Sequence, residues 1–162
     1  MGVQSFNDTQ LKRLGRRHTA ESARQAIMNA RNAGYSNISI DLMFALPGST
    51  ADEWQHDLDS ALALKPDHIS AYNLMYEEGT PLYRALQRGD FEELGEDENV
   101  EQFGMLIKTL KGAGYRHYEI SNFAISGKES LHNSSYWNDT SYIGCGAAAH
   151  SYNGTSREWN IA

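Results

Sequence analysis

The chain has a single cysteine, Cys145, among its 162 residues. One cysteine excludes a disulfide within the chain, and it excludes an all-cysteine zinc site or a complete iron–sulfur ligand set. Cys145, His132 and His150 form no helical i, i+4 pair and no tight cluster, so the spacing predicts no metal site. We expect Cys145 to be a small buried side chain.

Excess positive charge and long apolar runs are also missing. Lys and Arg number 14 against 21 Asp and Glu, a formal net charge of -7. Nucleic acids and anionic membranes both attract positive charge, so we expect neither as a partner. The longest apolar stretch, 42–46, is far short of the ~20 residues that cross a membrane. No signal peptide is visible at the start, which predicts a cytoplasmic location.

Three common catalytic or nucleotide-binding loops are absent. The segment Gly144-Cys145-Gly146 lacks both the third glycine of the dinucleotide fingerprint and the lysine of a P-loop. No G-x-S-x-G elbow is present, which disfavours a serine hydrolase. The sequence therefore excludes the best-marked phosphate and hydrolase sites.

The sequence does contain alternating helix and strand signals. We expect strands at 3–6, 35–44, 68–74 and 115–121, with helices after Thr19, from Thr50 to Leu64, from Pro81 and over 100–111. The segment 94–99 reads as an acidic loop. Such alternation predicts a parallel sheet with flanking helices, and a closed eightfold barrel needs ~250 residues. We therefore predict an α/β fold that is a partial barrel or an open sheet.

The pattern changes after Gly127, where polar, aromatic and small residues replace the alternation. We place a boundary near Ser126, with one part over 1–125 and the other over 126–162. Each end of the chain resembles the interior of a longer protein, so we expect a fragment.

Polar residues gather where the predicted strands end, which is where ligands bind in parallel α/β folds. The candidates are Gln4, Arg16, Arg17, Asp41, Asn73, Glu77, Glu119 and Asn122. A carboxylate, an arginine and an amide on one rim suit a ligand with hydroxyls and a carboxylate or phosphate. Alternatively, Asp41 and Glu119 are structural acceptors for nearby loop amides, and the residues alone leave both interpretations open.

The segment 132–137 combines a histidine with two aromatic residues. Tyr136 and Trp137 are typical of core aromatics. A planar apolar cofactor with an axial imidazole from His132 would use the same residue types.

Six segments together resemble the radical S-adenosylmethionine enzymes of the oxygen-independent coproporphyrinogen III oxidase family. In order along the chain they are Gly2 to Phe6, Leu14 to His18, Ile40 to Gly48, His68 to Thr80, Tyr118 to Ala124, and His132-Asn133-Ser134-Ser135-Tyr136-Trp137. The last of them resembles the heme-chaperone branch of that family.

The resemblance implies a partial TIM-like barrel of the radical S-adenosylmethionine type, with residues 1–125 as the second part of the barrel and 126–162 as a flanking segment that leads to a C-terminal domain. It also implies S-adenosylmethionine and a [4Fe-4S] cluster as cofactors. By resemblance, Gln4, Arg16 and Asp41 contact S-adenosylmethionine, and His132 belongs to a motif implicated in heme handling. Heme or porphyrin, and a protein that accepts heme, are the implied partners. Arg17 has no assigned role.

The family's cluster motif, Cys-x-x-x-Cys-x-x-Cys, does not occur in these residues, and we expect it upstream of Met1. We therefore predict that the chain alone is catalytically inactive. We also predict self-association through an exposed sheet edge near Val3. The alternatives are a true coproporphyrinogen III oxidase, which oxidatively decarboxylates propionates, and a non-enzymatic heme-binding module with His132 as an axial ligand.

Overall fold

The computed structural model describes residues 1–161, which form two compact units, unit 1 over Met1–Lys128 and unit 2 from Glu129 onward. Unit 1 contains β1 (Gly2–Gln4), α1 (Asp8–Arg13), α2 (Ala20–Asn32), β2 (Ser39–Phe44), α3 (Ala51–Ala63), β3 (His68–Asn73), α4 (Pro81–Gln87), α5 (Glu96–Gly112), β4 (Arg116–His117) and β5 (Asn122–Ala124). Unit 2 contains α6 (Leu131–Trp137), β6 (His150–Tyr152) and β7 (Arg157–Trp159). None of the described helices is long and apolar enough to cross a membrane.

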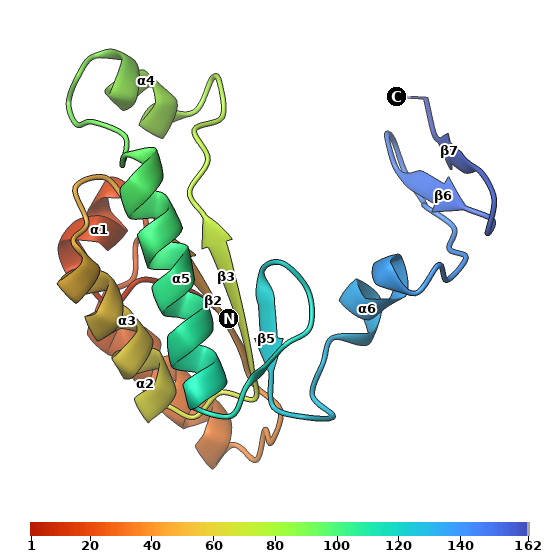
Figure 1. Cartoon of the computed structure of the whole chain (residues 1–162), viewed down its shortest axis with the longest axis horizontal. Helices are drawn as coiled ribbons and strands as arrows, with labels where there is room; N and C mark the ends of the chain where they lie inside the picture. Colours follow the sequence, from red (N-terminus) through yellow and green to blue (C-terminus); the bar gives the residue numbers. More distant parts are fainter. Residues whose placement is uncertain (162) are drawn as a thin grey trace. The chain divides into compact units, whose positions relative to one another are not determined.

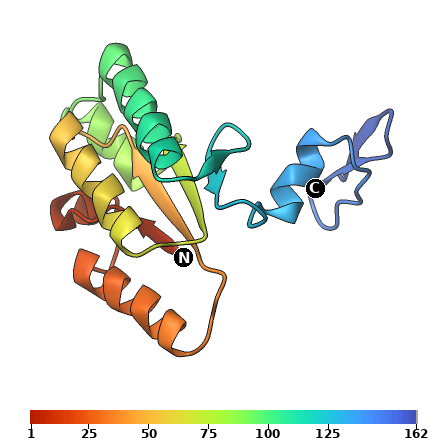
Figure 2. The ribbon, with the colours of Figure 1, turned by 60° about the horizontal axis from the view of Figure 1, so that its bottom comes forward.

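Unit 1 is built on a five-stranded sheet in the order β1-β2-β3-β5-β4. The strands β1, β2 and β3 run parallel, as the alternation of strands and helices predicts. Helices α3 and α5 lie side by side across this sheet (Figure 1). The view in Figure 2 shows α2 beside them along the same layer.

Alternation along β2 decides which face of the sheet is buried. Ile40, Leu42 and Phe44 are almost fully buried beneath the helices. The Phe44 ring lies 5.9 Å from the rings of both Trp54 and Phe103, which belong to α3 and α5. Burying each such side chain contributes roughly 1.5–3 kcal/mol, so this face stabilises unit 1.

Three helices begin at the threonines that the sequence indicates. The Thr19 and Thr50 hydroxyls accept hydrogen bonds from the backbone N–H groups of Ser22 and Glu53, and both sites form complete capping boxes. The Thr80 hydroxyl caps α4, which has proline at its first turn. The predicted starts of these helices are confirmed, because local side-chain chemistry sets them.

The predicted fourth parallel strand over 115–121 is wrong. The segment forms the short strand β4, a turn, and then β5, and β5 runs antiparallel to both β3 and β4. Glu119 stabilises the turn, because its carboxylate accepts hydrogen bonds from the backbone of Ser121 and the side-chain amide of Asn122. The sheet therefore ends in a hairpin rather than in another crossover.

Three smaller expectations also need correction. The strand predicted from residue 35 begins at Ser39, and the short helix α1 was not predicted. The acidic loop over 94–99 is largely the first turn of α5, where Glu96, Asp97 and Glu98 favour the positive end of the helix dipole.

Unit 2 contains no buried residue over 129–161. Cys145, expected to be buried, is exposed, because its glycine-rich loop lies on the surface of this small unit. Tyr136 and Trp137 are 45% and 58% exposed, so the interpretation of both as core aromatics is wrong. That residues 1–125 are part of a barrel and that 126–162 lead to a further domain both stay predictions.

Candidate functional site

The face of β2 opposite the helices carries the first candidate site. Asp41 projects there, half-buried, and Gly2 of β1 is its register partner. A Cβ on Gly2 would lie 2.6 Å from Nε2 of Gln4 and 3.9 Å from a carboxylate oxygen of Asp41. The missing side chain of Gly2 therefore leaves the space that brings Gln4 beside Asp41.

Gln4 has an unusual backbone conformation, with φ at +70°. A non-glycine residue held in this region costs of order 1–3 kcal/mol and is often found at ligand sites. The residue is 8% exposed, and its amide makes no hydrogen bond within the described part of the chain. The Asp41 carboxylate also has no hydrogen-bond partner there. Both groups keep their full capacity to bind a ligand.

Arg16 lies in the loop between α1 and α2, just after Gly15, whose φ is +68°. Its backbone N–H donates to the carbonyl of Leu11, which fixes the loop, while its side chain is exposed. Across residues 1–161 the Arg16 guanidinium forms no hydrogen bond or ion pair, including none to Gln4 or Asp41.

These three groups fit S-adenosylmethionine in their chemistry. A carboxylate such as Asp41 accepts hydrogen bonds from ribose hydroxyls, an amide such as Gln4 donates or accepts, and a guanidinium such as Arg16 pairs with a carboxylate. The unpartnered amide and carboxylate side by side support this fit.

A hydrogen-bonded chain crosses the same face, and sequence reasoning missed it. His68 Nδ1 lies 2.9 Å from the Ser39 hydroxyl, and His68 Nε2 lies 2.7 Å from the Tyr118 hydroxyl. Strand register makes the arrangement, because Ser39 is the partner of His68 in the parallel pair. Only a correct pairing of β2 with β3 could have predicted it.

Two other candidates of the predicted rim, Glu119 and Asn73, have structural partners. Both hydrogen bonds to one Glu119 oxygen come from its own turn, which confirms the structural interpretation of this residue. Asn73 donates to the side chain of Asn99 at 2.9 Å, which ties β3 to α5. Asn122 is buried, and its Oδ1 has no partner within residues 1–161. Glu77 is exposed.

The second candidate site lies wholly in unit 2. A cavity of about 500 Å³ is lined by His132, Ser135, Tyr136, Tyr142, Ile143, Gly144, Ala148, Ala149 and His150. The Tyr136 hydroxyl lies 3.2 Å from Nε2 of His132, and the two rings meet edge-on with centroids 5.1 Å apart. One turn of α6 therefore places the predicted histidine and tyrosine together.

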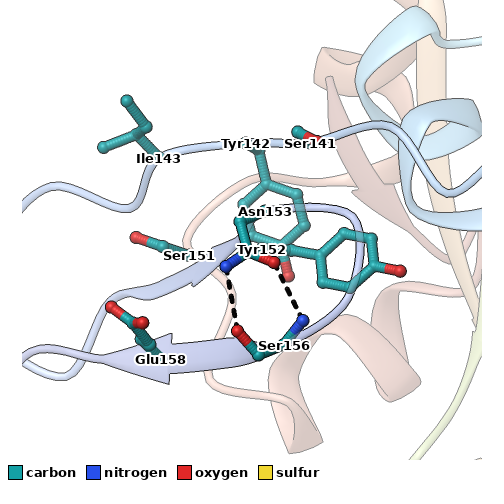
Figure 3. Close-up of a pocket in the computed structure, with 8 residues that line it drawn as sticks. All are labelled: Ser141, Tyr142, Ile143, Ser151, Tyr152, Asn153, Ser156 and Glu158. Atoms are coloured by element: carbon teal, nitrogen blue, oxygen red, sulfur yellow. Dashed lines mark hydrogen bonds between the residues drawn. The ribbon is translucent and has the colours of Figure 1, made fainter.

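A neighbouring cavity of about 620 Å³ has a different chemical character. Figure 3 shows its lining, with Tyr142 and Tyr152 on one side and a turn closed by hydrogen bonds between Asn153 and Ser156. Its lining holds no histidine or cysteine, and Glu158 is its one acidic residue. The cavity with His132 is therefore the better candidate for binding an iron porphyrin.

No group of three or more histidine, cysteine or acidic residues that could hold a metal occurs among residues 1–161. The sole cysteine is exposed in unit 2. These residues do not fit a [4Fe-4S] cluster, which takes several cysteine thiolates.

Comparison with known proteins places the chain among radical S-adenosylmethionine proteins. The model of the radical SAM superfamily matches residues 1–61. The chain is similar to the heme chaperone HemW of Bacillus subtilis, with 39% identity over 160 residues, 99% of this chain and 42% of that protein. It is also 38% identical over 150 residues to the mitochondrial radical S-adenosyl methionine domain-containing protein 1 of Danio rerio, covering 93% of this chain and 34% of that protein.

A solved structure has the same fold. Coproporphyrinogen III oxidase (HemN) from Escherichia coli, a radical SAM enzyme, matches with a TM-score of 0.74 and 21% identity over 99% of this chain and 40% of that one. This likeness confirms the expected α/β fold of parallel strands with flanking helices. The chain spans less than half the length of each of these relatives. By the family model over residues 1–61 and by its sequence relatives, the chain is related to the radical S-adenosylmethionine proteins, among them the heme chaperones of the HemW type, and it shares the fold of HemN.

Proposed function

We propose that this chain carries S-adenosylmethionine contacts in unit 1 and a heme-binding surface in unit 2, as parts of a heme chaperone. The His132–Tyr136 pair on an uncharged cavity of about 500 Å³ is the observation that carries the heme part. The 39% identity to a heme chaperone along almost the whole chain also supports heme binding as the function.

His132 is suited to bind heme iron. A neutral imidazole has one bare nitrogen that ligates a metal, and a hydrogen bond at the other nitrogen fixes the ring and its tautomer. The Tyr136 hydroxyl supplies a partner of this kind one turn along α6. The exposed rings of Tyr136 and Trp137 add apolar surface on which a macrocycle can rest.

Unit 1 is suited to bind the nucleoside and amino-acid ends of S-adenosylmethionine. In this proposal Asp41 and Gln4 bind the ribose hydroxyls, and Arg16 pairs with the methionine carboxylate. S-adenosylmethionine supplies a 5′-deoxyadenosyl radical when an iron–sulfur cluster reduces it. With one cysteine, these 162 residues cannot supply the thiolates that such a cluster takes.

A titration with ferric heme tests the heme-binding surface. We expect saturable binding by the full chain, and a loss of affinity of about tenfold or more in His132→Ala, which is about 1.4 kcal/mol. His56→Ala is the matched control, because His56 is an exposed histidine on α3 of unit 1. Wild-type affinity in His132→Ala would contradict the proposal.

Calorimetry with S-adenosylmethionine tests unit 1 separately. Asp41→Asn and Arg16→Gln should each weaken binding about tenfold, whereas Arg17→Gln, which changes the adjacent exposed arginine, should leave it unchanged. Heme binding without S-adenosylmethionine binding would favour the non-enzymatic heme module instead. The oxidase alternative has less support, because its structural relative at 21% identity shows the fold alone.

The remaining proposals concern activity, location and association. The chain alone should form no 5′-deoxyadenosine with a strong reductant after attempted cluster reconstitution, and turnover above trace levels would refute this.

We propose a cytoplasmic location, which cell fractionation tests, and a heme-acceptor protein as partner. Self-association through β1, which is an edge strand, predicts a species larger than a monomer by light scattering.

A further inference from the structure

We propose that His150 is a second ligand for heme iron, acting on the same cavity as His132. The proposal rests on heme binding by unit 2. It assigns a role to a residue of β6 that lies 18 positions from His132 in the sequence and outside its motif.

The two histidines line one cavity from two different elements. His132 comes from α6 and His150 from the start of β6, and both belong to the same compact unit. The volume of about 500 Å³ falls within the usual range for small-molecule and cofactor sites. The cavity is therefore large enough for a ligand to contact both imidazoles.

The backbone at His150 is held firmly. Gly144 packs so closely that a Cβ there would overlap the carbonyl group of His150. The Gly144 N–H donates to the Ser151 hydroxyl at 3.0 Å. The Asn160 side chain donates to the carbonyls of Gly146 at 2.8 Å and Gly144 at 3.2 Å, which fastens the glycine-rich loop against β7. This network fixes the position from which the imidazole projects.

The imidazole of His150 itself is not engaged. It is exposed, its ring centroid lies 6.2 Å from that of Trp159, and neither ring nitrogen makes a hydrogen bond within the described residues. His132 differs, because Tyr136 occupies one of its nitrogens. A fixed backbone with a free imidazole is what an additional metal ligand requires.

The walls of the cavity favour a planar apolar ligand. Ala148 and Ala149 of the glycine-rich loop line the cavity with small apolar side chains. Ile143, which is 87% exposed, and the ring of Tyr142 add larger apolar surface. Apart from the two histidines, no acidic or basic side chain lines the cavity, although the chain carries a formal net charge of -7. An iron porphyrin combines a flat apolar body with a metal that takes imidazole ligands.

The chemistry of this step is ligand exchange alone. A neutral imidazole nitrogen donates its lone pair to ferric iron and displaces a bound water, and the oxidation state of iron does not change. Two imidazoles give six-coordinate, low-spin iron. One imidazole leaves five-coordinate or water-bound, high-spin iron, so absorption and electron paramagnetic resonance spectra separate the two states.

The test uses the full chain with two probes, ferric heme and iron-free protoporphyrin IX. The variants are His150→Ala, His150→Gln and His132→Ala, with His56→Ala as the control. We expect low-spin ferric heme in the wild type and in the control, and high-spin heme with about tenfold weaker binding in each single variant of the two ligands. Affinity for the iron-free porphyrin should stay within about twofold, because it depends on the walls of the cavity. Added imidazole should restore the low-spin spectrum of His150→Ala.

The outcomes separate this inference from the proposed function. Low-spin heme with wild-type affinity in both His150 variants would overturn the second ligand while leaving heme binding intact. No saturable heme binding by the wild type would overturn both proposals. If His150→Ala lost iron-free porphyrin as well, His150→Gln would decide, since it keeps a side chain of similar length at the site.

Discussion

The two units differ in how they are held together. Unit 1 has a contiguous core of fully buried side chains between its sheet and helices, whereas unit 2 buries no residue within 129–161. Large apolar side chains of unit 2 are instead exposed, namely Leu131, Tyr136, Trp137, Ile143, Trp159 and Ile161. In a unit this small, apolar side chains that find no core stay on the surface. Unit 1 is therefore stabilised by its own packing, whereas unit 2 is held together by backbone hydrogen bonds and contacts between exposed aromatic rings.

Removing a buried side chain from the core of unit 1 should change the free energy of unfolding most. Leu106 of α5 is completely buried, so Leu106→Ala should lower the free energy of unfolding by about 2–5 kcal/mol. Ile143→Ala in unit 2 removes a comparable side chain that is 87% exposed, and it should change that free energy by less than about 0.5 kcal/mol. Urea denaturation of both variants measures the difference. Equal losses of unfolding free energy in the two variants would contradict the statement that only unit 1 has a core.

The close packing of Gly144 against the His150 backbone should have the next largest effect on stability and heme affinity. In Gly144→Ala the new methyl group meets the His150 backbone, and such overpacking costs typically about 1–3 kcal/mol. We expect heme affinity to fall about tenfold while the melting of unit 1 is unchanged. Gly104→Ala in α5 is the control, because a Cβ there meets open space. Undiminished heme affinity in Gly144→Ala would show that this packing does not shape the cavity.

Asp57 should give unit 1 a pH dependence of its own. Burial raises the pKa of this carboxyl above its usual 3.8, and hydrogen bonds from Ser5 and the Phe6 backbone offset part of that increase. The folded state therefore binds the proton more tightly than the unfolded state does. Stability should fall as pH rises from about 3.8 through the raised pKa.

Stability measured by denaturation across this pH range checks the sign. Asp57→Asn should flatten this part of the profile, whereas Asp59→Asn, an exposed neighbour on α3, should preserve it. A profile unchanged by Asp57→Asn would assign the slope to other groups.

The ion pair between Arg31 and Asp67 should have the smallest effect. Its atoms lie 2.7 Å apart on partly exposed side chains, and solvent screens such pairs to about 0–1 kcal/mol. We expect Arg31→Gln to destabilise unit 1 by no more than about 1 kcal/mol, and by less at high salt, in denaturation experiments. A loss above about 2 kcal/mol would mean that this pair is a major support of the fold.

Local signals in the sequence predicted part of this molecule well. Alternating residues identified the buried face of β2, and threonines identified the starts of three helices, because both depend on neighbours along the chain. The single strand expected over 115–121 failed, since the side chain of Glu119 folds that segment into a turn. Contacts across strands, such as Ser39 with His68, depend on register, which the sequence alone does not display.

The candidate sites were also predicted only in part. Parallel strand order brings Gln4 and Asp41 together, and the sequence anticipated a polar rim of this kind. The exposure of Cys145 was not anticipated, because composition predicts burial only where a core exists. The free imidazole of His150 depends on how the glycine-rich loop folds over β7, so no local pattern indicates it.

Hydrogen exchange with and without ferric heme tests most directly whether unit 2, rather than unit 1, binds heme. We predict that heme slows amide exchange in peptides from 129–161, with the strongest protection at α6 and around His150, and leaves exchange in the core strands β2 and β3 unchanged. Protection confined to peptides of unit 1, with none in 129–161, would contradict the assignment of heme to unit 2.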